Sequence, residues 1–113
     1  MVNVAITWRF PYHLPMPKAK LLLRSKLVYP DGSVQEFAIW QLPTATPDRP
    51  HGLNYRCYYG SADGKCLVRY DNESRRGDHI HLGTVEQPYA FQSVGQLLAD
   101  FERDVTRMRK VKQ

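Results

Sequence analysis

The sequence predicts an α+β fold in which an antiparallel sheet of four to five strands packs against one C-terminal helix. Two observations predict it. Alternating apolar and polar residues flank two tight-turn sequences, at residues 30–32 and 61–64. Between Val94 and Met108, near the C-terminus, the apolar residues instead recur at three- and four-residue steps, which is the period of an amphipathic helix. One helix on such a sheet is the smallest layered arrangement that buries both apolar surfaces.

The first hairpin follows an irregular arm, residues 1–17, that contains Pro11, Pro15 and Pro17. Its turn pairs the preset φ of proline with the positive φ open to glycine. Alternation predicts that one face of the hairpin belongs to the core. That face comprises Leu21, Leu23, Leu27, Phe37 and Ile39. On the other face, Lys26 is expected near Glu36.

The second hairpin joins residues 54–59 to residues 65–71, after a proline-rich loop at 43–52. Its predicted core side comprises Tyr55, Cys57, Tyr59, Cys66, Val68 and Tyr70. The opposite side comprises Arg56, Tyr58, Leu67, Arg69 and Asp71. If the two strands pair in a register that keeps these residues on these sides, Arg56 lies opposite Asp71 or Arg69. A short strand at 79–82 is expected to turn Ile80 and Leu82 inward, which turns His79 and His81 outward.

The helix is predicted to begin near Ser93, because Ser93 and Gln96 form a capping-box pattern. Its apolar stripe comprises Val94, Leu97, Leu98, Phe101, Val105 and Met108, over about four turns. Because one helix covers one face of the sheet, the other face is expected to stay open. That open face carries Arg24, Lys26, Arg56, Tyr58, Arg69, Asp71, His79 and His81.

Length and composition limit the classes of protein to which the chain can belong. With 113 residues, we expect a single domain over 18–113 after the arm. No apolar run approaches the roughly 20 residues that span a bilayer, and Arg9, Pro11 and Pro15 interrupt any secretory signal, so a cytoplasmic protein without membrane contact is expected. Cys57 and Cys66 are too few for a disulfide framework and are interpreted as free thiols.

The net charge of +5 is concentrated at the two ends of the chain. The basic residues before Asp31 are Arg9, Lys18, Lys20, Arg24 and Lys26. Those near the C-terminus are Arg107, Arg109, Lys110 and Lys112. If the fold brings the ends together, they form one positive surface suited to phosphates or to an acidic protein. Otherwise they are a solvated face and a frayed tail.

Arg69, Asp71, His79 and His81 share the open face, and three interpretations fit them. The first is acid–base cleavage of RNA without a metal, with the histidines moving protons and the arginine stabilising the phosphate. The second is a metal site, with a carboxylate from Asp71, Glu73 or Asp78 beside the His-x-His pair. The third is structural: Asp71 pairs with Arg56 or Arg69 and the histidines are exposed strand residues.

Other residues are candidates for RNA contacts. Arg75 and Arg76 at a loop tip either contact phosphates or form a soluble turn. Aromatic residues can stack on bases, although alternate tyrosines in a sheet more often pack within the protein. The candidates are Arg56, Tyr58, Tyr70, Arg75, Arg76, Arg107, Arg109 and Lys110, with Trp40 as a further stacking residue. His13 and His51, in proline-flanked segments, are interpreted as structural.

Several short motifs follow one another in a fixed order. They are Tyr-Pro-Asp-Gly-Ser at 29–33, Arg-Tyr-Asp-Asn-Glu at 69–73, Gly-Asp-His-x-His at 77–81, and Glu86 before Pro88-Tyr89. With the helix start near Ser93, they resemble the TumE family of small toxins from prokaryotic toxin–antitoxin pairs, over about residues 18–110. The matching residues are Arg69, Tyr70, Asp71, Asn72, Gly77, Asp78, His79 and His81. The arm lies outside the resemblance, and Ile80 stands where a basic residue is expected.

The resemblance implies a growth-inhibiting toxin with RNA as its target, neutralised by an antitoxin encoded beside it. Homodimers or hetero-oligomers with the antitoxin are compatible with this. From the residues, we predict that His79 and His81 share the acid and base roles, Arg69 stabilises the phosphate, and Asp71 orients an imidazole or Arg69. The alternatives are a non-catalytic module that binds nucleic acid or a partner, and a metal-dependent nuclease.

Overall fold

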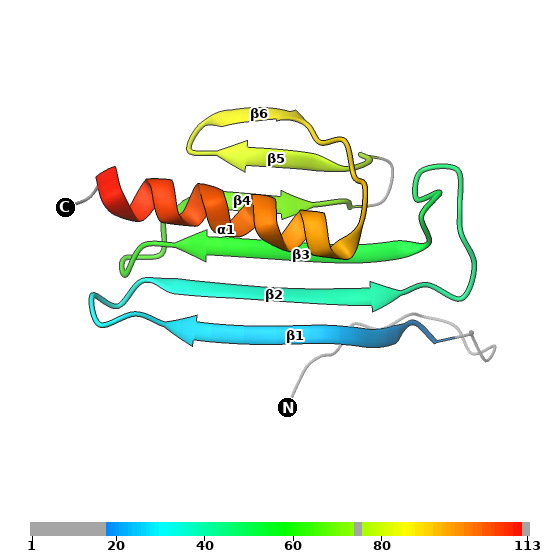
Figure 1. Ribbon diagram of the computed structural model, residues 1–113, viewed down its shortest axis with the longest axis horizontal. Coiled ribbons are helices and arrows are strands. Elements are labelled where there is room, and N and C mark those ends of the chain that lie inside the picture. Colours follow the sequence, from blue (N-terminus) through cyan, green and yellow to red (C-terminus); the bar gives the residue numbers. More distant parts are fainter. Residues whose placement is uncertain (1–17, 74–75, 112–113) are drawn as a thin grey trace.

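The computed structural model describes residues 18–73 and 76–111 of the chain. Within these residues, six strands form one antiparallel sheet in sequence order, and a single helix packs on one face of it (Figure 1). The strands are β1 (Lys20–Val28), β2 (Val34–Gln41), β3 (Leu53–Gly60), β4 (Cys66–Asp71), β5 (His79–Leu82) and β6 (Val85–Pro88). The helix α1 spans Val94–Val111. The α+β prediction is confirmed, but the sheet has six strands instead of four to five.

The additional strand is β6, which the sequence did not predict. It pairs with β5 across a turn in which Gly83 has a φ of 61°, a conformation that favours glycine. All four of its residues are exposed and the last is Pro88, so neither alternation nor composition distinguishes it from a loop. Its main consequence for the site is that Glu86 lies directly opposite His81.

The first hairpin has the predicted turn and places Lys26 opposite Glu36, as expected. The prediction that its leucines belong to the core is wrong. Leu21, Leu23 and Leu27 are 41%, 43% and 48% exposed. The reason is that α1 contacts β3 and β4 and does not extend over β1. A register shift between Leu21 and Leu23 also places Leu21 opposite Trp40, which removes it from the predicted face.

The second hairpin supplies most of the core. Tyr55, Cys57, Tyr59, Val68 and Tyr70 are buried on the side that faces α1, as predicted. The register places Arg56 opposite Asp71, one of the two expected pairings. A register shift between Tyr59 and Gly60 breaks the alternation at the far end, so Cys66 lies opposite Gly60 and is only half-buried.

Both cysteines are free, as expected from their number. Burial raises the pKa of the Cys57 thiol to about 12, so this side chain behaves as a small apolar core residue. The proline-rich loop at 43–52 folds back on itself, because the backbone N–H of Leu42 donates to the carbonyl of Gly52 at 2.8 Å.

The helix packs through Leu97, Phe101 and Val105, each at most 1% exposed. The Ser93 hydroxyl accepts the backbone N–H of Gln96 at 3.0 Å, which forms half of the predicted capping box. The side chain of Gln96 donates to Asp100 instead of returning to Ser93. With 18 residues, α1 makes about five turns rather than four. Among the described residues, no helix combines the length and apolar character needed to cross a membrane.

Truncation of the helix contact should be costly, and truncation of the exposed hairpin should not. We expect Phe101→Ala to lower the free energy of unfolding by about 3–5 kcal/mol, because it leaves a cavity in the core. Leu22→Ala, at a side chain that is 43% exposed, should change it by about 0.5 kcal/mol or less. Denaturant titration followed by circular dichroism measures both, and equal losses would contradict the described packing.

Candidate active site

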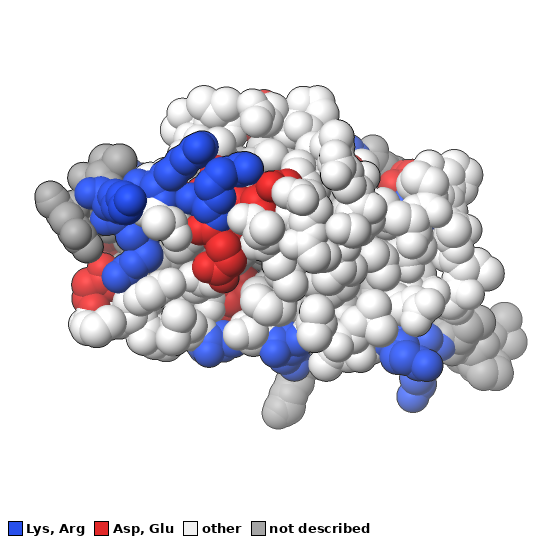
Figure 2. Space-filling model, in the orientation of Figure 1, with Lys and Arg blue, Asp and Glu red and all other residues white. Residues whose placement is uncertain are grey.

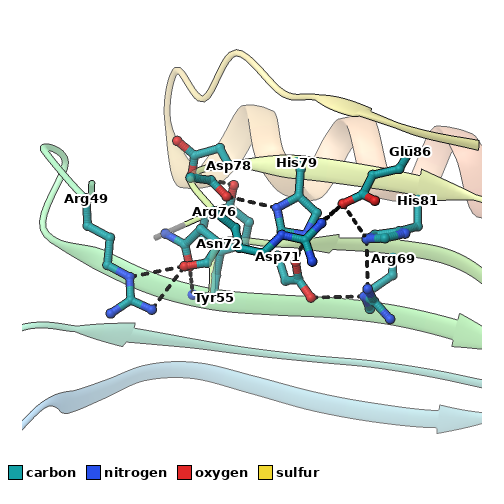
Figure 3. Close-up of polar contacts among 11 residues, drawn as sticks. Arg49, Tyr55, Arg69, Asp71, Asn72, Arg76, Asp78, His79, His81 and Glu86 are labelled. Carbon is teal, nitrogen blue, oxygen red and sulfur yellow. Dashed lines mark hydrogen bonds and ion pairs between the residues drawn. The ribbon is translucent and has the colours of Figure 1, made fainter. Parts of the chain in front are cut away.

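Strand pairing brings the four predicted residues together on the open face. On β4 and β5, Arg69 lies directly opposite His81, and Asp71 lies directly opposite His79. Figure 3 shows the four side chains side by side, with α1 behind the sheet. The inference from strand alternation, that these residues face away from the helix, is therefore confirmed by the register.

The four side chains form a continuous polar chain. Asp71 Oδ1 lies 2.5 Å from His79 Nε2, and Asp71 Oδ2 lies 2.9 Å from Arg69 Nε. The other end of the guanidinium, Arg69 Nη2, lies 2.8 Å from His81 Nε2. Asp71 and Arg69 therefore link the two imidazoles, whose ring centres are 5.0 Å apart.

The centre of this chain is buried although it lies on the uncovered face. Asp71 and His79 are each 4% exposed. The structural interpretation of His79 as an exposed strand residue is therefore wrong, whereas the ion pair it assumed between Asp71 and Arg69 is present. Despite the short distances, Arg69 Nε, Asp71 Oδ1 and His79 Nε2 are buried without a hydrogen bond of good angle.

The protonation of each imidazole follows from its neighbours. His79 Nδ1 lies 2.9 Å from the carbonyl of Gly77, which only accepts, so Nδ1 carries a proton and Nε2 points at Asp71. His81 Nε2 faces Arg69, which only donates, so Nε2 accepts there. Desolvation, followed by the positive charge of Arg69 and the nearby His79, lowers the pKa of His81 below its usual 6.5.

Glu86 and Arg76 complete the site, and the sequence analysis assigned no catalytic role to either. Glu86 Oε2 lies 3.3 Å from His81 Nε2 and 3.8 Å from His79 Nε2. Glu86 also pairs with Arg76, which enters from the loop before β5. The carboxylate of Glu86 therefore lies close to both imidazoles. The available signal was Gly83, directly after Leu82, which indicates that the chain reverses there but does not by itself predict a paired strand.

Asn72, directly after Asp71, fixes the end of β4. Its side chain is fully buried, accepts the backbone N–H of Tyr55 at 3.0 Å and donates to the carbonyl of Leu53 at 2.8 Å. Arg49, from the proline-rich loop, donates to the Asn72 carbonyl at 3.0 and 3.1 Å. These contacts give Asn72 a positioning role, because they hold the backbone that carries Asp71.

Asp78 takes part in a separate network. Its Oδ1 lies 2.9 Å from His51 Nε2 and accepts the hydroxyl of Tyr55 at 2.7 Å. Burial and this hydrogen bond raise the pKa of Tyr55. His51 also packs on Phe91, with ring centres 4.2 Å apart. Asp78 is therefore committed to the end of the core and is not grouped with the histidines of the site.

Among the described residues, one group could hold a metal ion, and it consists of residues of the polar chain. Asp71, His79 and His81 each offer one ligand atom, and these atoms lie within 4.8 Å of one another. Of the three carboxylates considered from the sequence, the structure places Asp71 in this group. Glu73 instead lines an adjoining hollow on the open face, together with Trp40, Arg56 and Asp71.

The candidate RNA contacts lie in different parts of the protein. Arg56 is exposed on the open face, with its guanidinium 5.4 Å from the centre of the Tyr58 ring. Tyr70 is fully buried against α1, where its hydroxyl donates to Asp104, so its ring cannot stack on a base. Arg75 and His13 lie outside the described residues.

The basic residues at the end of α1 differ in their contacts and in their exposure. Arg109 lies over the Tyr29 ring, 3.5 Å from its centre, and donates to Ser33 and Tyr59. Arg107 and Lys110 are exposed. Figure 2 shows basic side chains at the C-terminal end of α1 and others along the edge at which β1 lies, with acidic and uncharged surface between them. Among the described residues, the two ends therefore do not form one positive patch on this face.

Comparison with known proteins identifies the family. The family model described as Toxin TumE matches residues 18–109, which include the whole sheet and every residue of the site. The chain belongs to the TumE family. Neither a curated protein nor a solved structure matches it significantly. TumE membership makes the protein the toxin of a toxin–antitoxin pair and implies a cognate antitoxin, as the resemblance indicated.

The electrostatics of the TumE site can be tested through His81. Arg69→Met removes the adjacent positive charge, so we expect the pKa of His81 to rise toward 6.5. Arg56→Met is the matched control, because Arg56 lies opposite Asp71 and is not among the groups that shift His81. The measurement is an NMR titration of the His81 ring protons. A pKa of His81 that is unchanged in Arg69→Met would show that Arg69 does not contribute to lowering it.

Proposed function

We propose that this toxin cleaves RNA without a metal, through acid–base chemistry at Arg69, Asp71, His79 and His81. The observation that carries the proposal is that a buried carboxylate contacts one imidazole and one guanidinium, and that this guanidinium holds the second imidazole. In the reaction, the ribose 2′-oxygen loses a proton and bonds to phosphorus, and the bond from phosphorus to the 5′-oxygen breaks. The products are a 2′,3′-cyclic phosphate and a 5′-hydroxyl.

His81 suits the role of base. Its lowered pKa keeps the imidazole unprotonated near neutral pH. Its side chain is 19% exposed, against 6% for His79, so it is the more accessible of the two to a ribose. In the structure, the guanidinium of Arg69 donates a hydrogen bond to Nε2 of His81. A bound phosphate attracts Arg69, which frees this nitrogen to accept the 2′-hydroxyl proton.

His79 suits the role of acid. Its Nδ1 donates to the Gly77 carbonyl and its Nε2 faces Asp71, so both ring nitrogens have acceptors as neighbours. We assign to this ring the proton that is donated to the leaving 5′-oxygen. A hollow lined by Arg76, His79 and Glu86 reaches this side chain from the surface.

The open face offers a path for the RNA strand. A hollow lined by Trp40, Arg56, Arg69 and Asp71 leads to the site. Trp40 and Tyr58 are suited to stacking with bases, and Arg56 to contact with a phosphate. Arg76, exposed beside His79, is suited to a phosphate on the other side of the cleaved bond.

A metal-dependent nuclease is the second candidate, because Asp71, His79 and His81 form a compact group of nitrogen and oxygen ligands. Arg69 argues against it. Its guanidinium already contacts Asp71 at 2.9 Å and His81 at 2.8 Å, so a cation would have to displace or repel it. We therefore place the metal-independent reaction first.

Cleavage by the purified toxin in excess chelator tests the proposal. We expect activity to persist with chelator and to fall by about 10²-fold or more in His81→Ala and in His79→Ala, because each removes a proton-transfer group. Lys65→Ala, at an exposed turn residue, is the matched control and should retain activity. A substrate with a 2′-deoxyribose at the cleavage site should resist cleavage.

Two outcomes would contradict this function. Loss of cleavage in chelator, restored by a divalent ion, would assign the site to a metal-dependent nuclease. Retained toxicity in the His79→Ala, His81→Ala double variant would assign growth inhibition to non-catalytic binding.

The salt dependence of RNA binding locates the phosphate contacts. Arg56→Gln should reduce the slope of log K against log salt by about one, because one phosphate contact is lost. The matched variant Arg107→Gln, Lys110→Gln removes exposed charges at the end of α1. A reduced slope would add the helix end to the RNA surface, and an unchanged slope would assign these residues to solvent. An unchanged slope in Arg56→Gln would contradict the proposed path.

A further inference from the structure

We propose that the outer edge of β1 is the docking site of the antitoxin, which adds an extended acidic segment to the sheet as a further strand. This inference rests on membership of the toxin family, which implies an antitoxin, and is independent of the ribonuclease chemistry. Addition of a strand to a sheet edge is a recurrent mode of recognition, with affinity from the backbone and specificity from alternate side chains.

The first observation is the exposure of β1. All nine of its residues are exposed, although more than half are apolar. Leu22 and Leu23 are each 43% exposed, Leu27 is 48% exposed and Val28 is 58% exposed. Folded proteins normally shorten, bend or cover such an edge, because it invites pairing with another chain. A long apolar edge that α1 does not reach is therefore suited to a partner.

The second observation concerns the backbone. The N–H of Tyr29 donates to the carbonyl of Ser33, so the backbone hydrogen-bonding groups of this residue pair point toward each other, between the two arms of the hairpin. In an antiparallel ladder the inward-pointing pairs alternate with pairs whose groups point away. Counting back along β1 from Tyr29, the outward N–H and C=O groups belong to Val28, Lys26 and Arg24. These groups form a row that an added strand can pair with.

The opposite edge of the sheet is less suited to such pairing. β6 has only four residues and ends in Pro88, which has no N–H to donate. Glu86 on this strand is paired with Arg76 and faces the histidines. Of the two edges, β1 therefore offers the longer uninterrupted row.

Charge defines the kind of partner. β1 carries Lys20, Arg24 and Lys26 and no acidic residue. A second copy of this chain is disfavoured, because a two-fold pairing centred on Arg24 places that residue opposite itself. A pairing centred on Ser25 places Arg24 opposite Lys26. An acidic strand, by contrast, places unlike charges opposite one another.

The pattern of side chains expected in the partner follows from the two faces of β1. Leu23 and Leu27 lie on the side of α1, and Arg24 and Lys26 lie on the open side. The docking segment of the antitoxin should therefore alternate apolar residues, which cover the leucines, with Asp or Glu, which pair with the basic residues.

Amide hydrogen exchange tests this docking site directly. The full-length toxin is compared alone and in complex with the antitoxin encoded beside it, by NMR. We expect the amides of Arg24, Lys26 and Val28 to exchange rapidly in the free toxin and on the order of 100-fold more slowly in the complex. The amides of Leu23, Ser25 and Leu27, which pair with β2, should change less.

Three outcomes would overturn the inference. In the first, the complex forms without slowing exchange at Arg24, Lys26 and Val28. In the second, these amides are already slow in the free toxin at every concentration, which assigns the edge to residues 1–17. In the third, they become slow only as the concentration of the free toxin rises, which assigns the edge to a second copy.

Substitutions on the edge provide an independent test. Lys26→Pro removes one outward N–H without removing a bond to β2, and proline is tolerated at such edge positions. We expect it to weaken antitoxin binding on the order of tenfold. Arg24→Glu with Lys26→Glu should weaken binding at least as much, whereas the control Lys65→Glu should not.

Thermal unfolding establishes that each variant is folded. If Lys26→Pro disrupts the sheet, the charge reversals, which leave the backbone unchanged, decide the question. Unchanged affinity in the charge reversals would overturn the proposal. Failure of the ribonuclease proposal would instead appear as histidine variants that retain toxicity, with antitoxin binding unaffected.

Discussion

The buried carboxylate of Asp71 is the constraint on which the site depends. A charge that is 4% exposed is costly unless it is compensated, and here Arg69 and His79 compensate it at 2.9 and 2.5 Å. These contacts hold Arg69 where its far end reaches His81. Asp71 in turn depends on Asn72, whose buried side chain bonds the neighbouring β3 backbone. Loss of this carboxylate would leave Arg69 and His79 without their common partner, and His81 depends on Arg69 in turn.

The position of α1 determines how the two faces and the two edges of the sheet differ. Because α1 covers β3 and β4, the tyrosines of the core are buried beneath it and the opposite face remains available for the polar chain. The same placement leaves β1 uncovered along its length. The proposed catalytic face and the proposed antitoxin edge are therefore both consequences of a helix that contacts only two of the six strands, β3 and β4.

Much of this architecture follows from the sequence because strand alternation has a strict period of two. Once the apolar residues of β4 and β5 are assigned to the core side, Arg69, Asp71, His79 and His81 must share the opposite face in every register that keeps this assignment. Burial was harder to predict. His79 lies on the open face but is covered by its neighbours, and Leu23 and Leu27 lie on the helix side but beyond the reach of the helix.

Features that break the period were not predictable in this way. The register shift near Leu22 moves Leu21 off its expected face. β6 is short, exposed and ends in proline, so Glu86 could not be placed opposite His81 from alternation. Arg109 illustrates a third limit, since its ring contact with Tyr29 joins parts of the chain that sequence patterns do not relate.

The most direct test of the central role of Asp71 is the pH profile of RNA cleavage by Asp71→Asn. Asparagine keeps the shape of the side chain but removes the charge that faces His79 and Arg69. We predict that kcat falls by about 10²-fold or more, because the amide no longer holds Arg69 and His79 by charge. We also predict that the limb of the profile that reports His81 moves to lower pH, because the charge of Asp71 raises the pKa of His81 and a neutral amide does not. An unchanged rate and profile would contradict the account, since the cluster would then function without its anchor.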